Sequence, residues 1–391
     1  MKIVFLQKLL LTGLQVLTIL MISANTDAKT FGQLTVYLSA LAYLSGIFVL
    51  GANRHANYYK IEHPFAIRNI KFLYTVRIFL YCICCIAVLL LIAETSYWLE
   101  ILTVAMFLAT YREYHRYCRI QAKHIQCLNI EILFVRIIPL VCVLLTIYFA
   151  AFNVIEALLY SYIFGSMLTC VAMFIVMGKP RSGIELRTLD TRYLFGSWLY
   201  DIIALASRDL EVIFIAIFID FKSAGLYFLG KKLFGIMSLI NDSSQFLFEQ
   251  KLSNTDDLQV KGEYYRQRNI NLIFGIMLFL VIALCTYIYY SNISMLSQYI
   301  DAGSVLLDEN IILVICVFGM ARLVESSIGP YNSLLLMTRD FTGAYLVEIL
   351  VLVTKLVACF ATSMSIGEHW YVVLPYMRSI TLIIGRKVKI I

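Results

Sequence analysis

The sequence predicts an all-α polytopic membrane protein with about twelve transmembrane helices, and three observations predict this fold class. Of the 391 residues, 61% are hydrophobic and 15% are charged, whereas a soluble domain carries about 25% charged residues. The apolar residues occur in runs of roughly 20, the length of a helix that crosses a bilayer. Charged and turn residues separate these runs, so little of the chain remains for a large extramembrane domain.

Each expected span is an apolar run bounded by charged or turn residues. In chain order the spans are 3–23, 31–51, 72–93, 96–111, 130–151, 154–178, 193–219, 224–247, 270–290, 310–329, 341–363 and 370–385. The fourth and the twelfth give the weakest signals. The first is long and further spans follow at once, so we expect an uncleaved signal-anchor rather than a cleaved signal peptide.

The positions of lysine and arginine orient the spans. Of the 32 Lys and Arg residues, 22 lie on alternate connecting segments, and only Lys29 and Lys222 lie on the opposite segments. Because positive residues stay on the cytoplasmic side of short loops, both termini are expected in the cytoplasm. This topology, together with anionic lipid at the inner surface, accounts for the net charge of +7 and requires no nucleic-acid partner.

One short stretch of sequence recurs after about half the chain. The residues Asp27-Ala28-Lys29-Thr30-Phe31-Gly32 precede the second span, and Asp220-Phe221-Lys222-Ser223-Ala224-Gly225 precede the eighth. The copies are six spans apart, an even number, so the two halves are expected to share one orientation and to be related by an axis along the membrane normal. The alternative is a chance similarity between two tight turns. We take 1–180 and 181–391 as the two six-helix halves.

Four short motifs resemble a known family. They are Phe31-Gly32, Gly51-Ala52-Asn53-Arg54, Ala224-Gly225-Leu226-Tyr227 and Gly329-Pro330-Tyr331-Asn332-Ser333-Leu334-Leu335 before Arg339. With the span count and spacing, they resemble polysaccharide exporters of the multidrug/oligosaccharidyl-lipid/polysaccharide superfamily. In particular the chain looks like an O-antigen (Wzx-type) flippase.

The resemblance implies a definite architecture and activity. Two six-helix lobes would enclose a central cavity that opens alternately to the two sides of the bacterial cytoplasmic (inner) membrane. An undecaprenyl-pyrophosphate-linked oligosaccharide would be turned over there for O-antigen, lipopolysaccharide or capsule synthesis. The expected partners are this lipid-linked oligosaccharide, membrane lipid and other membrane proteins of polysaccharide assembly. No cofactor, metal or enzymatic activity is expected.

Cations inside the spans are the candidate substrate-binding residues, because burying an unpaired pyrophosphate in hydrocarbon costs many kcal/mol and arginine binds phosphate oxygens through a planar fork. An ionisable residue within a span is a functional candidate by default. The candidate cavity cations are Arg77, Arg136, Arg208, Arg322, Lys355 and Arg378. The candidate proton-coupling acids are Asp209 and Glu325.

Each candidate also has a structural interpretation. Arg77 and Arg136 are near the cytoplasmic ends of their spans and could snorkel to the headgroups. Arg208, near mid-membrane, could pair with Asp201 or a neighbouring helix instead of facing a cavity. Arg322 and Glu325 are three residues apart and could form a plain ion pair.

Two more polar stretches lie on the eighth span. At most one of the adjacent residues Lys231 and Lys232 can face a lumen fully. The simpler interpretation is that at least one of them extends its ammonium group to the headgroups of the outer leaflet. The polar residues 241–245 indicate a water-filled vestibule or a buried polar seam.

Motifs for other chemistry are absent. The sequence has no Walker A loop, no G-x-G-x-x-G, no H-E-x-x-H and no G-x-S-x-G. The Cys82-Ile83-Cys84-Cys85 run lacks further zinc ligands nearby, so packing residues are the better interpretation. The rival functions are a drug or metabolite antiporter of the same superfamily, which would need acids for its cations, and a membrane glycosyltransferase or O-antigen polymerase, which would need a larger external loop.

Overall fold

The protein is described from a computed structural model. The described residues are 2–58, 61, 63–64, 67–68, 70–91, 97–121, 123–149, 153–178, 187–235, 257–292, 297, 300, 303–328, 341–365, 374–376 and 380. The helices to Met177 are α1 (Lys2–Ala24), α2 (Ala28–Phe48), α3 (Ala52–Tyr58), α4 (Ile70–Leu91), α5 (Trp98–Ile120), α6 (His124–Glu131), the π-helix η2 (Ile132–Ile137), α7 (Ile138–Phe149) and α8 (Val154–Met177). The later helices are α9 (Thr191–Phe218), α10 (Phe221–Leu233), α12 (Asp257–Ser291), the 3-10 turn η4 (Val305–Leu307), α14 (Ile311–Ile328) and α16 (Phe341–Ser365).

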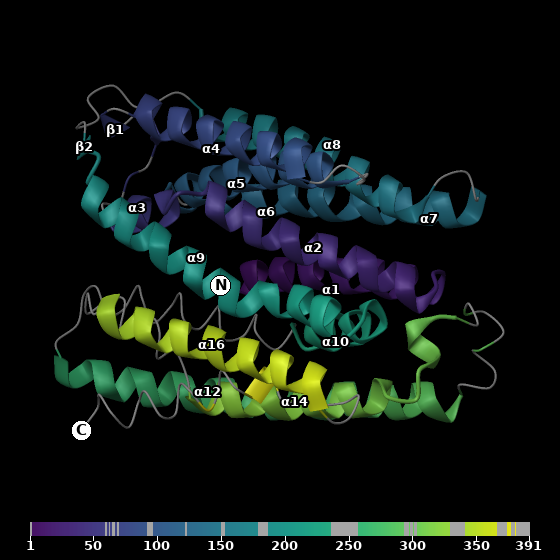
Figure 1. The fold of residues 1–391 in the computed structure, drawn as a ribbon. Helices are drawn as coiled ribbons and strands as arrows, with labels where there is room; N and C mark the ends of the chain where they lie inside the picture. The colour runs from purple at the N-terminus through teal and green to yellow at the C-terminus, as the bar shows by residue number, and fades with distance from the viewer. Residues whose placement is uncertain are drawn as a thin grey trace. The chain divides into compact units, whose positions relative to one another are not determined.

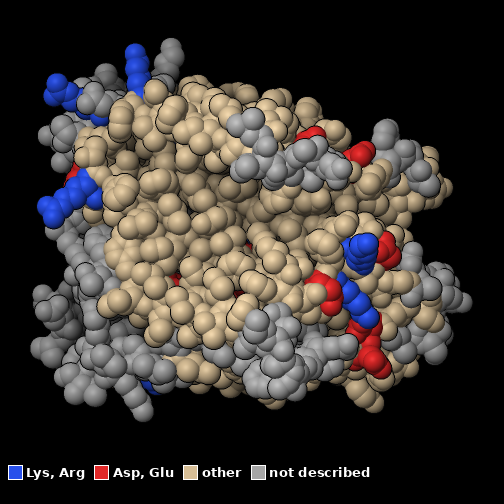
Figure 2. All heavy atoms as spheres, in the orientation of Figure 1, with Lys and Arg blue, Asp and Glu red and all other residues tan. Residues whose placement is uncertain are grey.

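The all-α polytopic fold class is confirmed, and ten of the twelve expected spans coincide with helices. The eighth span starts as expected in α10, and its residues beyond 235 lie outside the described part of the chain, as does most of the twelfth. Within the described ranges, six helical stretches are long and apolar enough to cross a membrane by length and composition alone. They are Leu6–Ala24, Ala28–Phe48, Ile70–Leu89, Ile125–Phe149, Val154–Met177 and Arg268–Ser291. On the face drawn in Figure 2, visible charged side chains gather toward the edges and uncharged atoms cover most of the area between them.

The chain divides into two compact units. Unit 1 comprises Met1–Thr18 and Tyr37–Asp209, and unit 2 comprises Ile19–Val36 and Leu210–Ile391. The boundaries fall inside α1, α2 and α9, so each of these helices contributes residues to both units. The division into halves at residue 180 stays a prediction.

Unit 1 is built around the packing of α5 against α8, which lie side by side in Figure 1. Small buried residues on α8, among them Ser161, Gly165 and Thr169, allow close approach of neighbouring helices. Helices α4 and α7 pack against this pair, with α4 contacting α5 and α7 contacting α8. A two-residue parallel pairing between β1 (Ile67–Arg68) and β2 (Arg187–Thr188) is the one described departure from an all-helical chain, and it joins two connecting segments of this unit.

The fifth span is not one continuous α-helix. The π-helix η2 lies between α6 and α7, directly before Pro139. Proline has no N–H to donate to the carbonyl four residues earlier, and helices adapt to that loss by a local change of winding. A Cβ on Gly165 of α8 would lie 2.1 Å from the carbonyl oxygen of Phe134 in η2, so only glycine fits at this contact.

In unit 2, α12 and α14 lie side by side, and α10 packs against α14. The two copies of the repeated turn begin helices in the same way. Asp27 accepts hydrogen bonds from the amides of Lys29 (3.1 Å) and Thr30 (3.0 Å). Asp220 accepts one from the amide of Ser223 (2.6 Å), so both aspartates are N-caps.

The two copies also touch each other. A Cβ on Gly32 would lie 1.8 Å from the carbonyl oxygen of Phe221, and a Cβ on Gly225 would lie 3.0 Å from Cδ1 of Phe31 and 3.4 Å from Cα of Gly32. Glycine at both positions therefore permits the first turns of α2 and α10 to approach within unit 2.

Candidate functional site

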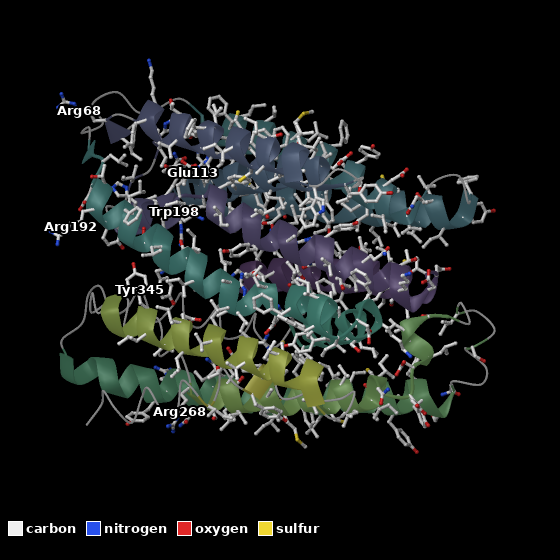
Figure 3. The ribbon with its side chains drawn as sticks, viewed as in Figure 1. Arg68, Glu113, Arg192, Trp198, Arg268 and Tyr345 are labelled. Carbon is white, nitrogen blue, oxygen red and sulfur yellow. The ribbon has the colours of Figure 1, made fainter. Side chains whose placement is uncertain are left out.

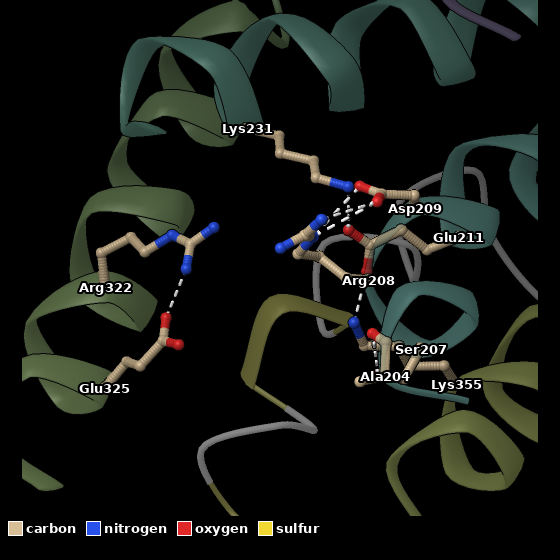
Figure 4. A network of polar contacts seen from close by, with 9 residues as sticks. All are labelled: Ala204, Ser207, Arg208, Asp209, Glu211, Lys231, Arg322, Glu325 and Lys355. Carbon is tan, nitrogen blue, oxygen red and sulfur yellow. Dashed lines mark hydrogen bonds and ion pairs between the residues drawn. The ribbon is translucent and has the colours of Figure 1, made fainter. Parts of the chain in front are cut away.

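A buried acid of α9 binds two lysines in unit 2 (Figure 4). Glu211 Oε1 lies 2.8 Å from Lys231 Nζ, and Glu211 Oε2 accepts a hydrogen bond from Lys355 Nζ. The exposed fractions of the side chains are 5% for Glu211, 11% for Lys231 and 5% for Lys355. Glu211 thus holds an ammonium group at each of its two oxygens, and the side chains of this lysine–glutamate triad lie largely away from bulk water.

Three helices position the triad. Glu211 is seven residues before the end of α9, Lys231 is in the last turn of α10, and Lys355 is near the middle of the 25-residue helix α16. Lys355 therefore lies roughly 20 Å from the start of its helix, at 1.5 Å per residue. A lysine at that depth can be ionised only when a carboxylate compensates its charge, and Glu211 does so.

Further polar groups lie in the same unit. Arg322 and Glu325 form the expected ion pair on α14, and their side chains are 20% and 23% exposed. The buried Tyr227 ring packs edge-on against Phe318 with centroids 4.8 Å apart. Glu348 of α16 is buried as well, at 1% exposure.

Arg208 pairs with its sequence neighbour rather than with Asp201. Arg208 Nη2 lies 3.0 Å from Asp209 Oδ2, and the Arg208 side chain is 51% exposed. Asp201 instead accepts a hydrogen bond from Arg54 Nε at 2.8 Å. The alternative that Arg208 pairs with Asp201 or with a neighbouring helix instead of facing a cavity stays a prediction. The exposed Arg208 guanidinium is accessible at the surface of unit 1.

Arg77 neither snorkels nor lies open to solvent in unit 1. It is 1% exposed, and its Nη2 donates a hydrogen bond of 2.6 Å to Glu113 Oε2. Figure 3 shows Glu113 among the helices of unit 1 and Arg68 projecting away from them. Tyr117 donates to the other Glu113 oxygen at 3.1 Å, so this acid is bonded on both oxygens. The pair ties α4 to α5 in the interior of the unit.

Arg136 differs from the other described candidates. It is half-buried on η2, its Nε is buried without a hydrogen-bond partner, and no ion pair joins it to a described carboxylate. Nearby, Tyr111 of α5 donates a hydrogen bond of 3.1 Å to Glu131. The guanidinium groups of Arg112 and Arg136 both lie close enough to the Tyr111 hydroxyl to interact with it electrostatically.

Part of the predicted set lies outside the described residues, namely Arg378 and the polar stretch 241–245. The structure therefore brings Lys355 to Glu211, Arg322 to Glu325, Arg208 to Asp209 and Arg77 to Glu113. The assignment of these residues to substrate binding or proton coupling stays a prediction.

Sequence reasoning missed three functional candidates. Glu211 is absent from the predicted set, although it is the acid that holds two lysines. Lys231 is predicted only to extend its ammonium group to the headgroups. Arg112 is absent as well, because it lies just beyond the fourth expected span, yet α5 continues to Ile120 and Arg112 donates a hydrogen bond of 2.7 Å to Ser45. Four expected spans contain a single cation together with at least one acid. This pattern indicates that ion pairs form, but it does not identify which acid pairs with which cation.

Neither a protein-family model nor a curated protein matches this chain by sequence. The fold is similar to that of solved transporters. One is an inward-facing multidrug resistance MATE family transporter of the MOP superfamily, with TM-score 0.66, 10% identity and coverage of 97% of this chain and 92% of that chain. Another is a MATE in complex with MaL6, with TM-score 0.65, 12% identity and coverage of 98% and 94%.

A third similar structure is a MOP superfamily transporter from Pyrococcus furiosus, with TM-score 0.64, 11% identity and coverage of 98% of this chain and 93% of that chain. The reverse polarity of that protein's binding pocket suggests a different function for it. At 10–12% identity these likenesses show a common fold, and a fold alone does not fix a substrate.

Proposed function

We propose, from a fold shared with MATE transporters of the MOP superfamily, that this chain is a membrane transporter working by alternating access, and that its substrate is an undecaprenyl-pyrophosphate-linked oligosaccharide. The transport class is supported by the two-lobed polytopic fold and its apolar helices. The substrate class is supported by the two buried lysines of the lysine–glutamate triad.

The triad favours an anionic substrate over a cationic drug. A site for a hydrophobic cation needs a buried acid that is available to it. Glu211 is instead occupied by Lys231 and Lys355, and Glu325 is occupied by Arg322. The buried ammonium groups of Lys231 and Lys355 are the kind of group that offsets the desolvation of a pyrophosphate.

The test begins with deletion of the gene in the source organism. The flippase proposal predicts loss of the surface glycan and accumulation of lipid-linked oligosaccharide on the inner leaflet. A parallel measurement of ethidium efflux tests the multidrug alternative. Normal glycan display in the deletion strain, with reduced ethidium efflux, would assign the chain to drug transport.

A substitution in the lysine–glutamate triad tests whether its lysines are needed for glycan display. In Lys231→Gln, Glu211 keeps Lys355 as its partner, so the buried acid stays compensated while one buried ammonium group is removed. We expect glycan display to fall at least tenfold at normal protein level. Lys222→Gln is the matched control, because Lys222 is on the same helix but its partner is Asp308, outside the expected span. Equal display by both variants would contradict the role of the triad.

A further inference from the structure

Arg136 and Arg112 of unit 1 both lie near Tyr111, whose hydroxyl donates a hydrogen bond to the acid Glu131. Glu131 is 8% exposed, and one of its oxygens accepts the hydrogen bond from Tyr111. Arg112 uses Nη1 to bind Ser45, and both arginines are half-buried rather than enclosed. The group therefore has a formal surplus of one positive charge that can be approached from solvent or headgroups.

The geometry of the π-helix gives Arg136 an unused donor. Its Nε–H is buried and has no acceptor among the described residues. A buried N–H without a partner costs roughly 1–3 kcal/mol. Arg77 also has such N–H groups, but it is enclosed and bonded to Glu113, whereas Arg136 is half-buried and has no described carboxylate partner, so we expect Arg136 to bind an acceptor from outside the chain. An anion with several oxygens would satisfy this donor and the remaining N–H groups of both guanidinium groups.

The depth of the two arginines indicates which anion. Helices α5 and α6 are consecutive, and residues 121–123 connect them at the end of unit 1 that is expected to be cytoplasmic. Arg112 is one residue beyond the fourth expected span, and Arg136 is six residues inside the fifth. This is the level at which lipid phosphates meet the hydrocarbon, and arginine binds phosphate bidentately.

We propose that Arg136, with Arg112 and the Tyr111–Glu131 pair, forms a binding site for the phosphate of a lipid headgroup at the cytoplasmic side of unit 1. This inference deepens the proposed function and rests on it for the identity of the lipid, because both undecaprenyl pyrophosphate and an abundant anionic phospholipid have the required chemistry. Arg136 binds the phosphate through Nε and the adjacent amino group, and Arg112 supplies the second charge.

The experiment measures lipid binding by the purified full-length protein in detergent. Undecaprenyl pyrophosphate and phosphatidylglycerol are titrated separately by microscale thermophoresis into wild type, Arg136→Gln, Arg136→Lys and Arg68→Gln. Loss of a charge-assisted hydrogen bond is expected to weaken binding about tenfold or more in Arg136→Gln. Arg136→Lys, which keeps the charge but lacks the planar fork, is expected to be intermediate.

Arg68→Gln is the matched control, since it removes one exposed arginine expected on the same side of the membrane. Size-exclusion profiles establish that each variant is folded. An Arg136-dependent loss with undecaprenyl pyrophosphate supports the site as part of the transport route. A loss confined to phosphatidylglycerol supports the site as a membrane-lipid contact and leaves the flippase function to the deletion test. Equal affinities of Arg136→Gln and Arg68→Gln for both lipids would overturn the proposal.

Discussion

The close approach of the two copies of the repeated turn predicts an unusual response to Gly32→Ala. Gly32 is in helix α2, where alanine is ordinarily favoured over glycine by about 0.5–1 kcal/mol. Here the added Cβ would lie 1.8 Å from the carbonyl oxygen of Phe221 and 2.4 Å from its carbonyl carbon. Because the obstacle is backbone, no rotamer change can relieve it.

The size of the effect follows from these distances. A Cβ atom essentially never lies closer than 3.0 Å to a neighbouring heavy atom, so the first turn of α10 must move by more than about 1 Å. Overpacking of this kind costs about 1–3 kcal/mol. After subtraction of the helix-propensity gain, Gly32→Ala is expected to destabilise the protein by up to roughly 2.5 kcal/mol.

The assay is thermal stability of the detergent-solubilised protein, measured as the monodisperse fraction that remains after heating. Gly13→Ala is the matched control, because Gly13 is also in a helix and a Cβ there meets nothing within 4 Å. It is expected to be at least as stable as wild type. Gly225→Ala, whose Cβ would meet a Phe31 ring atom at 3.0 Å, is expected to be intermediate. If Gly32→Ala matched Gly13→Ala, the backbone contact between the copies would be refuted.

Three other predictions concern packing and charge. Gly165→Ala should lower thermal stability by about 1–3 kcal/mol, because its Cβ would press on a π-helix carbonyl at 2.1 Å, and unchanged melting would contradict that packing. Glu113→Gln should destabilise by about 3–5 kcal/mol, since Arg77 would stay buried without its carboxylate, and a wild-type melting temperature would argue against the pair. Burial raises the pKa of Asp308, but hydrogen bonds from Lys222 and a backbone amide outweigh it and hold the pKa below 3.8. The stabilisation of the folded protein by the Asp308 carboxylate is present above pH 3.8 and is lost as the pH falls through the lower pKa of the folded state. Asp308→Asn should therefore make the stability depend less on pH at the acid end of a series measured from pH 7 to 3.

The course of the helices could be predicted from sequence because hydropathy and length determine which segments cross a membrane. Local winding was harder to predict. A proline such as Pro139 indicates a weakened helix, but it does not predict that a π-helix precedes it or that Gly165 accommodates that helix. The fourth expected span ends at residue 111, whereas α5 continues to Ile120, because hydropathy marks the end of the apolar run and a helix can continue past it.

The candidate site was predictable in its residue types and not in its pairings. Lys355 could be predicted to be buried because its distance from both ends of its span follows from the number of residues between them. Its partner Glu211 is 144 positions away in sequence, and only the packing of α9 against α16 brings the two together. Arg322 and Glu325 were predicted correctly because their pairing is local to one helix.

Gly32 and Gly225 restrict one another, because each lies against the first turn of the other's helix. A larger residue at either position would push away the turn that the other glycine accommodates. A variant that opens this contact on one side therefore gives the opposite position room for a side chain, so the effects of substitutions at the two glycines are expected to be non-additive.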